Sequence, residues 1–359
     1  RTLLTSWAVI LSITTFTLSM CGTFLVRSGI LNSVHTFAND PARGIFILIF
    51  LFVLIILSLG VFFLFQKENN KNSNNFFWLS RETSILINNW FMMYFLSVVL
   101  IGTVYPIFLE VMSSEKISVG PPFYQKLIAP FLILFLFFMS LGPRLKWIKS
   151  KIENKNSLII NLIISTMLSF FIIKNLTTHL LFYTVLVSAA FFLFLTTLKE
   201  LFIKKLKNVA QTVAHLGFSL LILSILFNNI LSSEIITNIR VGEKYNYSKG
   251  EIFFKKIEEN KESNFNSIVA YFEIKDLNGK IVKLKPEIRV YNQPAIITSE
   301  ADIKTTLLDD KFLVMNLVKG NEYFNIRYQV KPFMVWIWIS VLLLSLGGLM
   351  SLLKKRYEK

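Results

Sequence analysis

Residues 45–65 read IFILIFLFVLIILSLGVFFLF, and this stretch contains no charged residue. A transmembrane helix needs about 20 mostly apolar residues, because the hydrocarbon core of a bilayer is about 30 Å thick. Apolar stretches of this kind predict helices near residues 4–26, 45–65, 85–109, 127–142, 158–173, 180–198, 209–231 and 333–353. We therefore predict a polytopic α-helical membrane protein with about eight transmembrane helices.

Composition supports this class and argues against others. Hydrophobic residues make up 53% of the 359 residues and charged residues only 17%, which is too apolar for a soluble domain. The net charge is +16, but the basic residues lie in short loops between apolar stretches. They therefore indicate membrane topology rather than binding to nucleic acid. The single cysteine, Cys21, and the lack of CxxC or HExxH motifs argue against an intrachain disulfide or a zinc site.

Lysine and arginine predict the orientation of the chain, because they concentrate on the inner side of a membrane. They are dense in residues 66–84, 143–157, 199–208 and 354–359, which all fall on one side if eight helices cross the bilayer. We therefore expect the outer, periplasmic side to carry residues 24–44, 110–126 and 232–331.

Residues 232–331 differ in pattern from the rest of the chain. Apolar and polar residues alternate in 269–275 and 323–330, which is typical of strands with one buried face. Asn278-Gly279 is a strong hairpin signal, and Lys319-Gly320 is a weaker one. We predict a membrane domain over 1–231, a small outer antiparallel β domain over 232–331, and a final transmembrane helix with a basic inner tail over 332–359.

Two proline-containing segments predict breaks around the third helix. Pro106 is expected to kink or end that helix, and Gly120-Pro121-Pro122 is expected to end any regular element. The simplest interpretation of residues 110–126 is a tight turn outside the membrane. The alternative is one wall of an outward-facing site, in which Lys116 would meet an anionic ligand.

His215 is the first candidate for binding a cofactor. It lies roughly 10 Å into the seventh predicted helix, and a histidine at that depth needs a partner. Neutral imidazole is a common ligand of haem iron, so His215 is predicted either to bind iron or to hydrogen-bond to a neighbouring helix. The small residues Ala210, Ala214 and Gly217 nearby allow either close helix packing or a flat ligand.

His35 is the second candidate and lies in the outward segment with Arg27 and Arg43. A histidine in such a loop is usually solvated or part of a local cap, but arginines beside it would suit the propionates of a haem. Arg27 is also explained as a helix-end residue whose charge reaches the membrane surface. For His179, in a very short outward loop, we favour solvation at the interface.

Eight blocks of sequence carry a family resemblance. They are FLVRSGILNSVHTFANDPARG (24–44), SRETSILINN (80–89), GTVYPIFLE (102–110), KISVGPPFY (116–124), GPRLKW (142–147), VAHLGFSLLI (213–222), KPEIRVY (285–291) and KPFMVWIW (331–338). In this order, and over essentially the whole chain, they resemble the CcmF-type family (CcmF, CycK and NrfE), the membrane haem lyase subunit of cytochrome c maturation.

The resemblance implies roles for several residues. His35 matches the histidine that serves the family as an axial ligand of the haem being delivered, so a transient haem substrate would lie near it. His215 matches one of the two ligands of a stable b-type haem. Arg27 and Lys116 lie in family-like motifs and are weaker candidates for haem binding. No catalytic side chain is predicted, because the protein would supply positioning and the cofactor the chemistry.

The resemblance also implies partners. Haem would arrive from a haem chaperone of the CcmE type and would be joined by thioether bonds to the CxxCH motif of apocytochrome c. Other cytochrome c maturation subunits, of the CcmH and CcmI type, would assemble with the chain in the lipid bilayer. The predicted location is the bacterial inner membrane or, alternatively, the mitochondrial inner membrane.

The chain departs from the family pattern at its tryptophans. The family's tryptophan-rich WWD motif and two of its histidines are absent, and the six tryptophans are scattered at Trp7, Trp78, Trp90, Trp147, Trp336 and Trp338. We therefore expect a fragment, or the C-terminal piece of a split protein that needs a separate N-terminal half carrying the WWD motif. Alone, the chain is expected to bind haem incompletely and to lack lyase activity, which leaves open whether it is itself an enzyme.

Two other functional classes remain open. A transporter or permease subunit for haem or another solute would line its path with Arg27, His35 and His215. A structural assembly subunit would use its outer β domain to dock partners and would not need the histidines.

Overall fold

The computed structural model describes residues 5–27, 41–65, 77–113, 117, 119–152, 154–203, 209–293, 295–318 and 322–357. The long helices in these residues are α1 (Thr5–Arg27), α2 (Pro41–Phe65), α3 (Arg81–Ser113), α4 (Pro121–Leu141), α5 (Lys155–Ile173), α6 (Leu180–Ile203), α7 (Val209–Leu231) and α8 (Met334–Tyr357). Within the described ranges, eight helices are long and apolar enough to span a membrane. The prediction of a polytopic α-helical membrane protein is therefore confirmed.

The helix boundaries show that neither proline segment ends a helix, while the alternative of a kink at Pro106 stays a prediction. Helix α3 does not end at Pro106 but continues to Ser113, because a helix that ended inside the bilayer would leave backbone groups without partners. Pro121 and Pro122 do not end an element but begin α4. Proline fits the first turn of a helix, where its missing N–H would have had no partner in any case.

The chain divides into two compact units, of which the first comprises Arg1–Ile128 and Lys146–Ser150. Within it, α1 packs against α2. Helix α3 approaches the start of α4 closely at Gly102, where an added Cβ would lie 2.6 Å from the hydroxyl of Tyr124. The backbone N–H of Ile148 donates a hydrogen bond that is shared by both oxygens of the buried Glu82 carboxylate, at 2.9 and 3.1 Å. Ile148 has a positive φ of 67°, so this carboxylate holds a strained residue in place.

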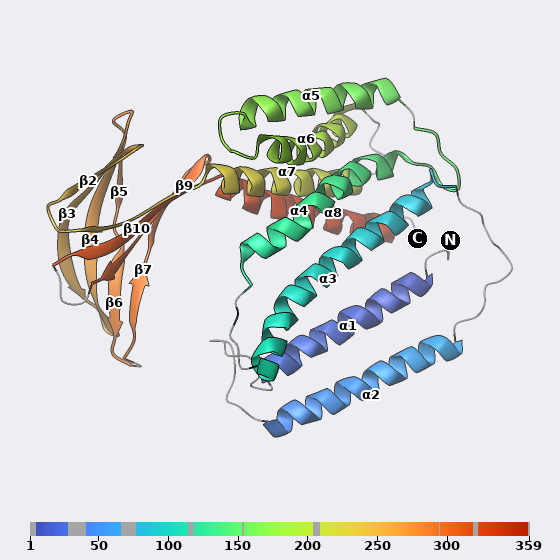
Figure 1. Cartoon of the computed structure of the whole chain (residues 1–359), viewed down its shortest axis with the longest axis horizontal. Helices are drawn as coiled ribbons and strands as arrows, with labels where there is room; N and C mark the ends of the chain where they lie inside the picture. The colour runs from blue at the N-terminus through green and yellow to red at the C-terminus, as the bar shows by residue number, and fades with distance from the viewer. Residues whose placement is uncertain are drawn as a thin grey trace. The chain divides into compact units, whose positions relative to one another are not determined.

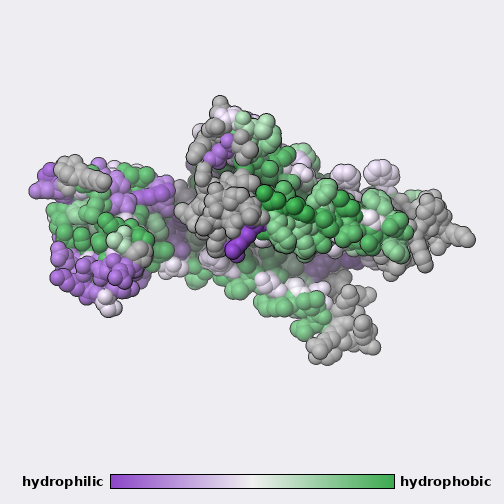
Figure 2. Space-filling model, turned by 90° about the horizontal axis from the view of Figure 1, so that it is seen from below, coloured by the Kyte–Doolittle hydropathy of each residue, from purple (hydrophilic) through white to green (hydrophobic). Residues whose placement is uncertain are grey.

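The second unit comprises Ala129–Leu145 and Lys151–Lys359. Its helices α5, α6, α7 and α8 lie side by side in chain order (Figure 1). Their core centres on the middle of α6, where Val187, Ala190 and Leu193 are fully buried. On the face shown in Figure 2, hydrophobic residues predominate on the helices, whereas on the strands hydrophilic residues surround a hydrophobic patch. This distribution is the one expected of a membrane bundle that carries a water-exposed domain.

Between α7 and α8 the chain forms a β-sandwich. Its strands are β1 (Ser233–Ile239), β2 (Lys244–Tyr247), β3 (Gly250–Lys261), β4 (Phe265–Asp276), β5 (Ile281–Leu284), β6 (Glu287–Tyr291), β7 (Ile297–Glu300), β8 (Asp302–Thr305), β9 (Asp309–Leu317) and β10 (Phe324–Pro332). One sheet has the order β1-β10-β9-β8, and the other has the order β2-β3-β4-β6-β7, with β5 also paired to β4. All of these pairs are antiparallel.

The core of the sandwich follows from the alternation in the sequence. Inward residues of both sheets form one apolar cluster, in which the rings of Phe254 and Phe272 stack with centroids 4.3 Å apart. The predicted turn at Asn278-Gly279 is present, with a φ of +80° at Gly279. The second predicted turn, Lys319-Gly320, lies outside the described residues.

The sandwich is joined to the helices by a compact junction. Helix α7 leads into β1, β10 leads into α8, and β1 pairs with β10. The side-chain amide of Asn228, near the end of α7, donates a hydrogen bond to the carbonyl oxygen of Pro332 at 2.6 Å. The ring of Phe227 packs against that of Phe333, with centroids 5.6 Å apart. Phe333 has a φ of +62°, so the chain turns sharply from strand to helix at this residue.

Candidate functional site

The structure describes some of the predicted site residues and not others. His35 and Lys116 lie outside the described residues. Arg27 is the last residue of α1 and is exposed. His179 is also exposed, and its carbonyl oxygen accepts the backbone N–H of Tyr183 in the first turn of α6. His215 is therefore the predicted iron ligand whose surroundings can be followed in detail.

His215 lies about 9 Å into α7, six residues after its first residue, at a rise of 1.5 Å per residue. Residues three and seven positions further along a helix share the same face, so His215, Phe218 and Ile222 form one stripe. Phe218 packs edge-on against Phe135 of α4, with ring centroids 6.0 Å apart. Both Phe218 and Ile222 also contact the apolar core that centres on α6. The imidazole therefore lies on the stripe of α7 that packs against α4 and α6.

The small-residue face of α7 has a different neighbour. An added Cβ at Gly217 would lie 2.8 Å from the backbone nitrogen of Leu344 in α8. In return, an added Cβ at Gly347 of α8 would lie 2.6 Å from the backbone nitrogen of Ala214. Of the two interpretations of this face, close helix packing is the one that the structure supports. A flat ligand bound to His215 would have to lie on the stripe with Phe218 instead.

A second axial ligand does not come from His179. This residue precedes α6 at the end of the bundle where α7 finishes, and His215 is 16 residues, or roughly 24 Å, from that end of α7. In the part of the chain that the structure describes, no group of three or more His, Cys, Asp or Glu side chains could hold a metal ion. Among the described residues, His215 thus stays a candidate ligand predicted from the sequence, with no such group around it.

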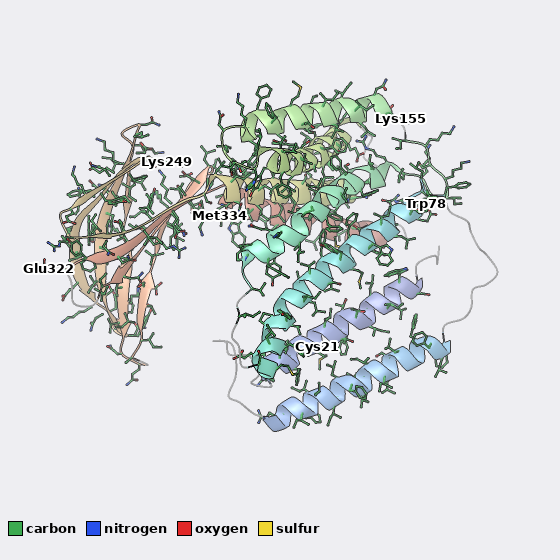
Figure 3. All side chains as sticks on the ribbon, in the orientation of Figure 1. Cys21, Trp78, Lys155, Lys249, Glu322 and Met334 are labelled. Carbon is green, nitrogen blue, oxygen red and sulfur yellow. The ribbon has the colours of Figure 1, made fainter. Side chains whose placement is uncertain are left out.

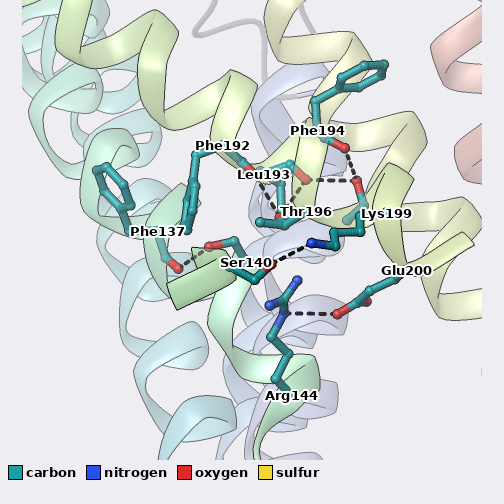
Figure 4. Close-up of polar contacts among 11 residues, drawn as sticks. Phe137, Ser140, Arg144, Phe192, Leu193, Phe194, Thr196, Lys199 and Glu200 are labelled. Carbon is teal, nitrogen blue, oxygen red and sulfur yellow. Dashed lines mark hydrogen bonds and ion pairs between the residues drawn. The ribbon is translucent and has the colours of Figure 1, made fainter. Parts of the chain in front are cut away.

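A polar cluster at the basic end of the second unit was not predicted from the sequence. Arg144 Nε and Glu200 Oε1 form an ion pair at 3.0 Å, and both side chains are largely buried (Figure 4). Next to Glu200, the Nζ of Lys199 donates a hydrogen bond to Ser157 Oγ at 2.6 Å. The partners are more than 40 residues apart, so no local pattern indicates their pairing. The cluster ties α5 and the end of α4 to the last turn of α6.

The first unit contains a small cavity. Its volume is about 340 Å³, and it is lined by Trp78, Thr83, Leu86, Ile87 and Trp90. Figure 3 labels Trp78, just before α3 begins. None of the predicted haem-binding residues lines this cavity.

Comparisons with known proteins agree with the fold. A family described as the CcmF C-terminal β-sandwich matches residues 230–332. The cytochrome c-type biogenesis protein CcmF of Pseudomonas fluorescens is 30% identical over 98% of this chain and 55% of its own length. CcmF of Escherichia coli is 30% identical over 99% of this chain and 56% of its own length.

A solved structure of the cytochrome c haem lyase CcmF matches with a TM-score of 0.73, at 21% identity, over 97% of this chain and 55% of that one. The likeness supports the arrangement of helices and sandwich described above. The chain spans about half the length of the relatives that it matches. Over nearly its whole length the chain is therefore similar to the CcmF cytochrome c-type biogenesis proteins, and residues 230–332 match the family model of their C-terminal β-sandwich.

Proposed function

We propose that this chain acts in cytochrome c biogenesis as part of a membrane haem lyase. In this proposal, the protein accepts haem from a chaperone of the CcmE type and presents it to the CxxCH motif of apocytochrome c, together with subunits of the CcmH and CcmI type. The support is a chain related over nearly its whole length to cytochrome c biogenesis proteins, with a histidine inside a transmembrane helix. The proposed location is an inner membrane, with the sandwich on the outer side.

His215 is the observation that carries the cofactor part of the proposal. A polar imidazole within a transmembrane helix is costly without a partner, and iron is a suitable partner for a neutral imidazole. Because α8 occupies the small-residue face, we propose that a b-type haem meets α7 along the stripe of His215 and Phe218. When bound, haem would supply the redox chemistry, while the chain supplies an axial ligand and an apolar environment that excludes water.

The second haem position is proposed from the sequence. His35 would bind the iron of the haem that is being transferred, and Arg27 and Lys116 would pair with its propionates. Haem held in this way would be oriented for attack by the apocytochrome thiols, which is a contribution of proximity rather than of acid–base catalysis.

The test replaces His215 by alanine in the chain co-expressed with a WWD-bearing N-terminal segment of a CcmF relative. The purified complex is expected to lose its b-type absorbance, because the iron would lose an axial ligand. His179→Ala is the matched control and should retain the absorbance, since His179 is exposed and distant along the helices. An unchanged spectrum in the His215 variant would exclude His215 as the ligand. His35→Ala should block attachment of haem to apocytochrome c and leave the b-type spectrum intact.

A further inference from the structure

The turn between β8 and β9 exposes two leucines beside the start of α8. Leu307 is 67% exposed and Leu308 is 71% exposed. The indole N–H of Trp336 donates a hydrogen bond to the carbonyl oxygen of Leu307 at 2.9 Å. The backbone N–H of Phe333 donates one to the carbonyl oxygen of Leu308, also at 2.9 Å. The turn is thus fixed by its backbone to the first turn of α8, and its two apolar side chains remain uncovered.

The turn is ordered by its own hydrogen bonds. The hydroxyl oxygen of Thr306 accepts the backbone N–H groups of Leu308 (3.2 Å) and Asp309 (3.0 Å). The Thr306 hydroxyl can donate in turn to Asp309, whose carboxylate and carbonyl oxygens lie 2.8 and 2.9 Å away. A loop held in this way cannot fold its leucines back into the core. Burying these leucines against another apolar phase would be favourable, because it would remove apolar surface from water.

The position of the turn relative to the bilayer follows from α8. The apolar segment of this helix begins at Met334, and Trp336 and Trp338 follow at once, as in the aromatic belt at a membrane surface. Because Trp336 bonds directly to Leu307, the leucines lie at the level of this belt. Apolar side chains at this level reach the boundary between headgroups and acyl chains.

Two lysines lie on the water side of the leucines. Lys304 and Lys311 are directly opposite each other in the β8–β9 ladder, an arrangement that is unfavourable for two like charges. Each is two residues from the turn, or roughly 7 Å along its strand. With the leucines in the acyl boundary, the lysine ammonium groups would reach the phosphates, which would offset their repulsion.

We propose that the β8–β9 turn inserts into the membrane surface beside α8, with Leu307 and Leu308 in the acyl boundary and Lys304 and Lys311 on anionic headgroups. The partner is an anionic phospholipid bilayer. The insertion gives the sandwich a second attachment to the membrane besides α7 and α8. It is independent of the proposed haem function.

The experiment measures how deeply single residues lie in the membrane. An environment-sensitive fluorophore is attached to a single cysteine of the full-length chain in lipid vesicles. In a Cys21→Ser background, Leu308→Cys and Leu307→Cys are compared with Leu317→Cys. Leu317 is the matched control because it is also an exposed leucine, at 52%, and lies at the other end of β9, nine residues and therefore roughly 30 Å from Leu308. Figure 3 labels Met334, at the start of α8, and Glu322, on the far side of the sandwich from it.

The labels at positions 307 and 308 are expected to be quenched by spin-labelled lipids and protected from aqueous iodide. The label at position 317 is expected to be quenched by iodide and not by the spin-labelled lipids. Equal accessibility to iodide at 308 and 317 would overturn the proposal, and so would protection from both quenchers, which would mean that protein covers the turn. Adding phosphatidylglycerol to phosphatidylcholine vesicles should increase lipid quenching at 308 several-fold. A Lys304→Gln/Lys311→Gln variant should lose that increase, and an unchanged increase would exclude the lysines from headgroup binding.

Discussion

At the scale of single residues, Tyr328 shows how the sandwich core includes a polar group. Its side chain is almost fully buried in the middle of β10, and its ring lies edge-on to that of Tyr247, with centroids 6.2 Å apart. Burial raises the pKa of the Tyr328 hydroxyl, and the neighbouring Tyr247 and the carboxylates of Asp309 and Asp276 raise it further. The core is therefore compatible only with the neutral form of this tyrosine.

This shift predicts an alkaline limit to the stability of the sandwich. Below about pH 10, the ordinary pKa of tyrosine, Tyr328 is neutral in both the folded and the unfolded state. The free energy of unfolding is therefore not reduced by its titration in this range. Above that pH the unfolded state loses the proton first, and the free energy of unfolding falls as pH rises towards the raised pKa of the folded state. Tyr328→Phe should make this fall shallower.

The measurement is the thermal midpoint of the sandwich, followed through a fluorophore at Glu322→Cys in the Cys21→Ser chain as pH rises above about 9. Tyr323→Phe is the control, and its thermal midpoint should fall with rising pH as steeply as that of the parent chain. Identical slopes for Tyr328→Phe and its parent would show that Tyr328 does not set the alkaline limit.

At the scale of elements, the pairing of α7 with α8 depends on glycines that only the folded structure identifies. A Cβ at Gly347 would lie 2.6 Å from the backbone of Ala214, whereas a Cβ at Gly348 would meet nothing within 4 Å. The sequence indicated a small face near His215 but could not say what covers it, because Gly347 is more than 130 residues away. Two adjacent glycines in one helix thus have opposite surroundings.

Alanine at these two positions should have opposite effects on stability. Gly347→Ala is expected to lower the stability by about 1–3 kcal/mol, because two backbones must move apart. Gly348→Ala should be neutral or stabilise the protein by about 1 kcal/mol, because alanine favours helix and the space is open. Thermal unfolding in detergent compares the two variants, and a similar loss in both would contradict close packing at Gly347.

Much of the fold could be predicted from the sequence because its signals are local. The length of an apolar stretch is sufficient to identify a transmembrane helix. The Asn278-Gly279 pair indicates a turn by itself, and in the structure the carboxylate of Asp276 accepts the backbone N–H groups of Asn278 and Lys280 at this turn. Helix ends were less predictable, because α3 begins at charged residues whose helical state depends on contacts such as Glu82 with Ile148.

The site was predictable only in part. The depth of His215 follows from counting residues along one helix. Which residues of α4 and α6 lie next to its stripe cannot be obtained by such a count. The Arg144–Glu200 pair joins residues that are 56 positions apart, and only tertiary packing brings them together. Long-range contacts of this kind leave no periodic pattern in the sequence.

At the scale of the whole molecule, the distribution of basic residues predicts which parts of the chain face each side of the membrane. Lys155, the first residue of α5, belongs to a loop that is predicted to lie inside, whereas Glu322 belongs to the sandwich, which is predicted to lie outside. Both statements require an odd number of membrane crossings between these two residues, and three helices, α5, α6 and α7, lie between them.

Cysteine labelling can test this topology directly. In the Cys21→Ser chain, Glu322→Cys should react with a membrane-impermeant maleimide added outside intact spheroplasts. Lys155→Cys should react only after the membrane is permeabilised. Reaction of both cysteines from the same side would mean that the predicted orientation, or the number of crossings, is wrong.

The junction between the sandwich and the helices has a mechanical consequence. A domain carried on one strand can rotate about that strand, but this one is carried on β1 and β10, which are hydrogen-bonded to each other, and on the Asn228 contact to Pro332. Twisting the sandwich would therefore require the α7–α8 pair to twist with it. A torque applied to the strands would therefore reach α7, the helix that contains His215.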